Sequence, residues 1–206
     1  MGVGFDDLTR ENAIDLCKRL IDEHRSAYMV TPNPEIVMAA WENAELHDAI
    51  CNADLVIPDG IGVVKAARII GTPLKERLPG IEIGEAILEY AAQTGKSVFL
   101  LGAKPGVADA AKEKMQETYP GLNVCGTNDG YFKDDGPVVE KINAAQPDFL
   151  MVCLGAPKQE LWMAQNAERL DVGLMAGLGG SLDVFAGTVM RDTMTWQRMN
   201  AACLGR

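Results

Sequence analysis

The sequence predicts an α/β fold, with a mostly parallel β-sheet and helices on both of its faces. Three observations lead to this prediction. Short apolar runs alternate with longer segments of helical spacing, most of the apolar runs stop at Gly or Pro, and no linker or low-complexity tract divides the chain. Parallel strands need crossover helices, and these helices cover the sheet on both sides.

The first half of the chain shows this alternation in order. Apolar residues recur every three or four positions from Asn12 to Glu23, which predicts a helix. Pro34 begins another helical segment, at a position where the missing N–H of proline costs little. The predicted helices cover residues 12–23, 34–43, 47–52, 61–70 and 81–94, and the predicted strands cover residues 27–30 and 55–57.

The second half continues the pattern with clear stop signals. Gly95 caps one predicted helix, and Pro120 with Gly121 ends another. Residues 126–136 are rich in turn-forming residues and are predicted to form a mobile loop. The predicted strands cover residues 97–101, 122–125, 149–153 and 172–175, and the predicted helices cover residues 107–119, 138–145 and 159–169.

Composition limits the class of protein. The 206 residues are 48% hydrophobic and 23% charged, as in a globular domain, and no apolar run approaches the roughly 20 residues of a membrane span. A net charge of −10 disfavours nucleic acid as a partner. Five scattered cysteines and two distant histidines have no disulfide or zinc spacing, so we expect no metal site and a cytoplasmic location.

Polar and small residues follow five of the predicted strands. The carboxyl ends of parallel strands meet at one edge of a sheet, so we expect these residues to lie close together. The start of the helix near Lys158 suits an anion such as a phosphate, because its backbone N–H groups are free. The candidates are Thr31, Asn33, Asp59, Gly102, Gly155, Lys158, Gln159, Glu160 and Asp183, with Arg77 from a loop.

Each candidate also has a purely structural interpretation. Thr31 and Asn33 are helix-capping residue types, and Asp59 between Pro and Gly suits a turn. Asp183 on a helix face and Arg77 as a solvated charge are equally ordinary. The dinucleotide-binding glycine fingerprint, the P-loop and the serine nucleophile elbow are all missing from the sequence. The residues alone therefore predict an α/β protein with a crevice for a phosphate and a carboxylate beside it.

A set of motifs, taken in order, resembles the WecG/TagA/CpsF glycosyltransferase family. The likeness extends to about Arg191, and the ordered set is specific although each piece alone is not. The motifs are Thr31-Pro32-Asn33-Pro34-Glu35, Pro58-Asp59-Gly60-Ile61-Gly62, Arg77-Leu78-Pro79-Gly80, Leu101-Gly102-Ala103, Gly130-Tyr131-Phe132, Leu154-Gly155-Ala156-Pro157-Lys158-Gln159-Glu160 and Gly179-Gly180-Ser181-Leu182-Asp183.

The resemblance implies a Rossmann-like inverting transferase that works without a metal or another cofactor. It implies transfer of N-acetylmannosamine, or its uronic acid, from a UDP-sugar donor. The implied acceptor is N-acetylglucosamine on a polyprenyl (undecaprenyl) diphosphate lipid at the inner face of the bacterial plasma membrane. The products would serve teichoic acid or other cell-surface polysaccharide synthesis, and the protein would be peripheral to the membrane surface.

The resemblance also implies roles for individual residues. Asp59 matches the proposed general base, and Thr31 and Gln159 match catalytic-site positions. We expect Lys158 and the backbone N–H groups near Gly102 and Gly155 to stabilise the diphosphate. The remaining expected substrate-binding residues are Asn33, Arg77, Glu160, Asp183 and Arg191.

The sequence departs from the family pattern near its C-terminus. We therefore expect one α/β domain over residues 1–190, with two merged Rossmann-like halves as an alternative, and an atypical or truncated segment over residues 191–206. In the family this segment helps to reach the membrane and supplies arginines to the site. Its divergence leaves open a catalytically silent sugar-nucleotide binder and self-association as a homo-oligomer. An NAD-dependent oxidoreductase is a further alternative, which the missing glycine fingerprint disfavours.

Overall fold

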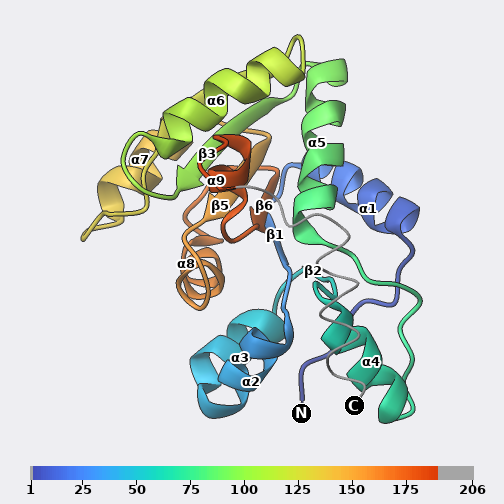
Figure 1. Cartoon of the computed structure of the whole chain (residues 1–206). Coiled ribbons are helices and arrows are strands. Elements are labelled where there is room, and N and C mark those ends of the chain that lie inside the picture. Colours follow the sequence, from blue (N-terminus) through green and yellow to red (C-terminus); the bar gives the residue numbers. More distant parts are fainter. Residues whose placement is uncertain (1, 190–206) are drawn as a thin grey trace.

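The structure is a computed structural model, and it describes residues 2–189. Within these residues, six parallel strands form one sheet in the order β2-β1-β6-β5-β3-β4 (Figure 1). The predicted α/β class is therefore confirmed. The strands are β1 (Ala27–Val30), β2 (Leu55–Val56), β3 (Ser97–Gly102), β4 (Asn123–Asn128), β5 (Phe149–Cys153) and β6 (Leu174–Gly177).

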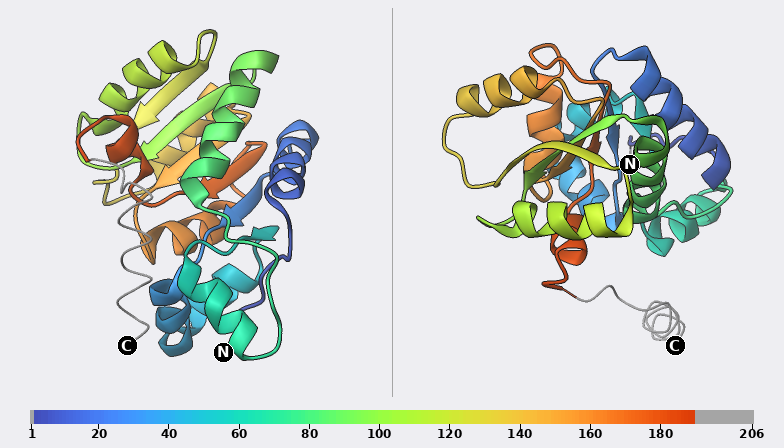
Figure 2. Two further views of the ribbon diagram at one scale, coloured as in Figure 1. Left: turned by 45° about the vertical axis from the view of Figure 1, so that its right-hand side comes forward. Right: turned by 90° about the horizontal axis from the view of Figure 1, so that it is seen from above.

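Helices cover both faces of this sheet (Figure 2). Buried residues of α1, α5, α6 and α9 pack on one face, and those of α2, α3, α7 and α8 pack on the other. Successive strand residues alternate between these two cores, as the pleat requires: Met29 joins the first core and Val30 the second. The helices are α1 (Arg10–Glu23), α2 (Pro34–Glu42), α3 (Ala44–Cys51), α4 (Ile61–Ile69), α5 (Gly80–Thr94), α6 (Val107–Thr118), α7 (Gly136–Ala145), α8 (Lys158–Asn166) and α9 (Ser181–Phe185).

Most predicted elements are present within a few residues of their predicted bounds, with two differences. The first part of the predicted loop over residues 126–136 belongs to β4, because Gly126 pairs with Phe99 of β3. A Cβ atom on Gly126 would lie 2.4 Å from Cε2 of Phe99. The glycine that suggested a turn therefore leaves room in the sheet for the ring of Phe99. The second difference is α9, a short helix that the sequence analysis does not delimit.

The parallel order brings all six carboxyl ends to one edge. From β1 the chain passes to β2 on one side of the sheet, whereas from β3 it passes to β4 on the other side. Ligand crevices in such sheets open at the carboxyl edge, between connections that leave in opposite directions. The five predicted polar strand exits lie along this edge.

Candidate active site

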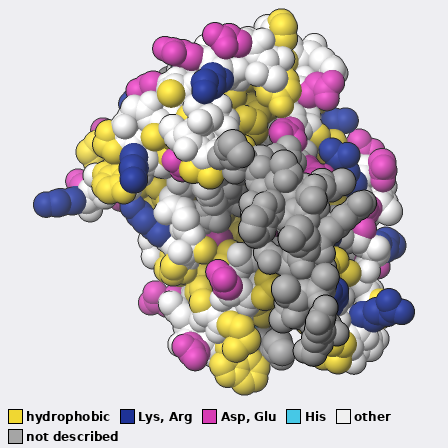
Figure 3. All heavy atoms as spheres, viewed as in Figure 1, with side chains coloured by type: hydrophobic (Ala, Val, Ile, Leu, Met, Phe, Trp, Pro, Cys, Tyr) yellow, Lys and Arg dark blue, Asp and Glu magenta, His cyan; other side chains and the backbone are white. Residues whose placement is uncertain are grey.

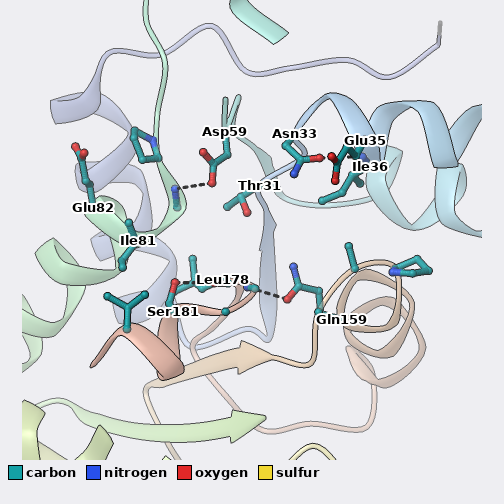
Figure 4. A pocket seen from close by; sticks show the side chains of 18 of the residues that line it. Thr31, Asn33, Glu35, Ile36, Asp59, Ile81, Glu82, Gln159, Leu178 and Ser181 are labelled. Atoms are coloured by element: carbon teal, nitrogen blue, oxygen red, sulfur yellow. Dashed lines mark hydrogen bonds between the residues drawn. The ribbon is translucent and has the colours of Figure 1, made fainter. Parts of the chain in front are cut away.

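A pocket of about 1220 Å³ opens at the carboxyl edge of the sheet. Its walls come from the exits of β1, β2, β5 and β6 and from the first turns of α2, α5 and α8. Thr31, Asp59 and Gln159 all line it (Figure 4). The structure thus brings together the three residues that the sequence analysis expects in the catalytic site. Asn33, Arg77 and Gly155 line the same pocket.

Asp59 is the carboxylate at the centre of this pocket. The backbone N–H of Gly80, in the first turn of α5, donates to its Oδ2 at 3.3 Å, and Nη2 of Arg77 lies 3.6 Å from its Oδ1. Burial raises the pKa of Asp59 above its ordinary value, although the Gly80 N–H and the Arg77 guanidinium both act to lower it. A carboxylate with a raised pKa, held in place but a third exposed, is suited to accept a proton from a bound hydroxyl.

The two β1-exit candidates have different structural duties. Asn33 is the N-cap of α2, because its Oδ1 accepts the N–H of Ile36 at 2.9 Å. Figure 4 shows the nitrogen of this amide turned into the pocket. Thr31 does not cap the helix: its hydroxyl donates to the carbonyl of Gly177 at 2.9 Å and joins β1 to the end of β6. Both side chains are therefore fixed at the wall of the pocket.

Gln159 is buried and connects two other segments of the site. Its Nε2 donates to Oε1 of Glu160 at 2.9 Å, while its Oε1 accepts the backbone N–H of Gly179 at 3.0 Å. The first contact fixes which way the amide points, and the second holds the glycine loop after β6. Gln159 therefore positions that loop as well as lining the pocket.

Glu160, which the sequence analysis expects among the substrate-binding residues, does not line this pocket. Its side chain is fully buried, and among the described residues its Oε2 has no hydrogen-bond partner. Burial raises the pKa of this carboxyl, while the hydrogen bond from Gln159 lowers it. Glu160, the third residue of α8, points into the protein, whereas Gln159 just before it lines the pocket. Glu160 therefore supports Gln159 from behind, through the hydrogen bond to its amide.

A second pocket of about 670 Å³ adjoins the first. The two share Gly155, Gly179 and Gly180 in their linings. Lys158 lines the second pocket, and its Nζ donates to the carbonyl of Gly130 at 2.8 Å and lies 4.6 Å from the ring centre of Phe132. This lysine therefore fastens the segment after β4 while it brings positive charge to the pocket.

The charged residues are divided unequally between the two pockets. Beside Asp59 and Arg77, the first pocket has Glu35 and Glu82 in its lining. The second has Asp183 and three lysines, Lys104, Lys133 and Lys158. An anionic group is thus better accommodated in the second pocket, next to the carboxylates of the first.

Sequence reasoning missed several lining residues. Lys104 and Lys133 come from loops, where a lysine has no pattern that separates it from a solvated one. Gly80 was easier to single out in the sequence, because it belongs to the Arg77-Leu78-Pro79-Gly80 motif. It contacts Asp59 through its backbone N–H, however, and any residue except proline has such a group.

The two other candidates lie elsewhere. Gly102 lines neither pocket; a Cβ atom there would lie 2.2 Å from the carbonyl oxygen of Cys153, so the glycine serves the close approach of β3 to β5. Arg191 lies outside the described residues. Within those residues, no group of three or more His, Cys, Asp or Glu side chains is placed to hold a metal ion. None of the described helices has the length and apolar character that crossing a bilayer requires.

The fold and the two pockets define a class: a parallel α/β protein with adjoining pockets at the carboxyl edge and a partly buried aspartate in one of them. The family model described as the glycosyl transferase WecG/TagA/CpsF family matches residues 1–206. The chain belongs to this family.

Two relatives carry the name N-acetylglucosaminyldiphosphoundecaprenol N-acetyl-beta-D-mannosaminyltransferase. The protein from Bacillus spizizenii is 39% identical over 171 residues, which are 83% of this chain and 66% of the relative. The protein from Staphylococcus aureus is 35% identical over 203 residues, which are 97% of this chain and 80% of the relative. The matched part of this chain thus spans about two thirds of the length of the Bacillus protein.

Proposed function

We propose that this chain is an inverting glycosyltransferase that moves N-acetylmannosamine, or its uronic acid, from UDP to N-acetylglucosamine on an undecaprenyl diphosphate lipid. Such a reaction would serve teichoic acid or other cell-surface polysaccharide synthesis at the inner face of the plasma membrane. The names of the two relatives support the transferred sugar and the acceptor. The observation that carries the proposal is the position of Asp59 in a pocket that adjoins a lysine-rich one.

In the proposed step, Asp59 takes the proton of the acceptor hydroxyl. The acceptor oxygen then forms a bond to the anomeric carbon of the donor sugar, and the bond from that carbon to the UDP oxygen breaks. Attack from the face opposite to UDP inverts the anomeric configuration. UDP is a good leaving group, so a single carboxylate suffices where glycoside hydrolysis uses two.

The second pocket is the proposed seat of the UDP diphosphate. Lys104, Lys133 and Lys158 bring positive charge to it, and Gly155 and Gly179 border both pockets. Charge that develops on the leaving diphosphate is stabilised by such groups without any reorganisation during the reaction. We therefore propose transfer without a metal ion, with rates that are the same in EDTA and in added magnesium. A loss of transfer in EDTA that magnesium restores would contradict this part.

The decisive variant is Asp59→Asn, which keeps the size of the side chain but removes the base. We expect transfer to a short-chain lipid-linked N-acetylglucosamine to fall by about 10²–10⁴-fold, the usual share of a general base, with the Kd for UDP almost unchanged. Glu35→Gln is the matched control, because Glu35 lines the same pocket and the proposal gives it no proton transfer.

Three outcomes separate the possible functions. Unchanged turnover in Asp59→Asn would refute the role of the base. Tight UDP binding without any transfer by the wild-type chain would mean a silent sugar-nucleotide binder. Binding of NAD in place of UDP would favour the oxidoreductase.

A further inference from the structure

Five large hydrophobic side chains remain exposed on two helices, α2, which lines the pocket, and α4. They are Met38 and Trp41 on α2, and Ile61, Ile69 and Ile70 on or directly after α4. Trp41 is 66% exposed and Ile69 is 85% exposed, whereas tryptophan and isoleucine side chains are usually largely buried. A group of this kind marks a contact surface more often than a chance arrangement. We refer to these five residues as the α2/α4 patch.

The two helices that carry the patch, α2 and α4, contact each other near their first residues. A Cβ atom on Gly62 of α4 would lie 2.7 Å from Cγ of Pro34, the first residue of α2. From Pro34, Met38 and Trp41 follow at i+4 and i+7 on one face of α2. From Gly62, Ile69 follows at i+7 on the same face of α4. Both helices occupy the lower end of the molecule in Figure 1, and Figure 3 shows hydrophobic side chains at that end.

The charge around α4 differs in sign from that of the chain. Residues 60–75 contain Lys65, Arg68 and Lys75 and no Asp or Glu, in a chain of net charge −10. Lys75 is held by Asp7, whereas Lys65 and Arg68 form no ion pair with residues of the described part. On α2, the charged residue next to Trp41 is the negative Glu42. The unpaired positive charge of this region therefore comes from Lys65 and Arg68 of α4. Exposed apolar and basic residues on one helix are typical of helices that lie in a bilayer interface.

The patch and the pocket lie on two sides of α2. Asn33, Ile36 and Ala39 of this segment line the pocket, while Met38 and Trp41 remain exposed. A surface that rested on the patch would therefore lie next to the pocket, with only one helix between them.

We propose that the α2/α4 patch docks on an anionic lipid bilayer. The apolar side chains enter the interface, Lys65 and Arg68 meet the lipid headgroups, and the pocket is held at the level where a lipid-linked diphosphate lies. This inference rests on the proposed function, because only an acceptor with a lipid anchor gives the docking a purpose.

The test is co-sedimentation of the full chain with vesicles of phosphatidylcholine that contain either no phosphatidylglycerol or about a third of it. We expect binding to the anionic vesicles that weakens as salt rises. The variant Lys65→Gln with Arg68→Gln should lower the partition coefficient by about fivefold for each charge removed. Ile69→Ser with Ile70→Ser should lower it about tenfold through the lost apolar contact.

The matched control removes two exposed charges far from the patch. Arg19 and Arg25 lie in and just after α1, on the side where β1 begins. Arg19→Gln with Arg25→Gln should bind vesicles like the wild type. Equal losses in this control and in the Lys65/Arg68 variant would show a general charge effect and overturn the proposal.

Two acceptors separate this inference from the proposed function. The Ile69/Ile70 variant should keep its rate with a short-chain, water-soluble acceptor and lose it with a long-chain acceptor in vesicles. Absence of transfer with either acceptor in the wild type would end the proposed function, while vesicle binding would still be measurable. Absence of vesicle binding would overturn the docking, as would a dimer that the Ile69/Ile70 variant breaks, since the patch would then join two copies.

Discussion

At the residue scale, Asp59 shows how neighbours from distant segments give one side chain its chemistry. Arg77 and Gly80 reach its two oxygens from the segment that precedes α5 and from the first turn of α5. The positive charge of Arg77 and the N–H dipole of Gly80 lower the pKa of Asp59. Burial raises the same pKa by more, so the pKa of Asp59 lies above its ordinary value. A fully exposed aspartate would be a weaker base, and a fully buried one would not meet a substrate.

The raised pKa predicts how Asp59 affects stability. The charged form is less favourable in the folded state than in the unfolded chain, so its contribution to stability is full below the unfolded pKa and is lost as pH rises through the folded pKa. Asp59→Asn should therefore unfold in urea at an equal or higher midpoint at pH 7, while activity is lost. A clear fall in the midpoint would mean that the ion pair with Arg77 outweighs the burial of the charge.

Glu160 gives a sharper version of the same argument, because it is fully buried. Its pKa is raised by burial, so wild-type stability should fall relative to Glu160→Gln as pH rises from 4 towards 8. The glutamine keeps an oxygen that can accept the hydrogen bond from Gln159. Urea unfolding of both proteins across this range measures the effect, and parallel curves would contradict it.

Glu160→Leu serves as the companion variant for the site. It removes the acceptor that fixes the amide of Gln159, and so loosens the hold on the backbone N–H of Gly179. We expect KM for the UDP-sugar to rise in Glu160→Leu and to stay near the wild-type value in Glu160→Gln. Equal KM values in the two variants would show that Glu160 has no positioning role.

At the scale of elements, the turn between β3 and α6 shows why two nearby glycines differ. Gly102 and Gly106 both have positive φ, at 133° and 84°. A Cβ atom on Gly102 would overlap the backbone of β5, whereas one on Gly106 would meet nothing within 4 Å. The first glycine serves strand packing, and the second serves only the local conformation that precedes a helix.

This difference predicts the outcome of two alanine variants. Gly106→Ala should cost about 1–2 kcal/mol of unfolding free energy, the strain of a left-handed residue. Gly102→Ala should cost at least about 3 kcal/mol, because β3 or β5 must also shift. Chemical denaturation of the pair measures both values. A Gly102→Ala protein as stable as Gly106→Ala would mean that the strand end yields easily.

At the scale of the whole molecule, the two pockets adjoin each other at the carboxyl edge of the sheet and share Gly155, Gly179 and Gly180. Carboxylates gather in the first pocket and lysines in the second, although the chain as a whole is strongly acidic. The net charge of the chain therefore bears on which partners its surface repels, whereas the local division of charge bears on which ligand we expect the pockets to accept.

Ligand binding at this site should stabilise the whole chain. UDP at 100 times its Kd is expected to add about 2.7 kcal/mol to the unfolding free energy and to raise Tm by roughly 5–10 °C for a chain of this size. NAD at the same concentration should have no effect. Thermal unfolding with each nucleotide measures this, and a larger shift with NAD would reverse the ranking of the two functions.

Much of the fold and part of the site could be predicted from local pattern. Helical spacing and strand runs gave the elements, and the parallel order then placed Thr31, Asp59 and Gln159 at one edge. Local pattern misjudged Gly126, which reads as a turn but pairs with Phe99 in the sheet. It also could not separate Gln159 from Glu160, because two neighbours on a helix point in different directions and only packing decides which one lines the pocket.

The sequence by itself determined the α/β class, the sheet edge where the two pockets lie and the family resemblance, because periodicity, turn residues and motif order are local properties. The tertiary structure alone decided that Gly80 and Arg77 hold Asp59, that Gln159 clamps the Gly179 loop, and that lysines from three segments surround a second pocket. These contacts join residues far apart in the chain. Their distances depend on how the helices pack on the sheet, and no short stretch of sequence encodes that packing.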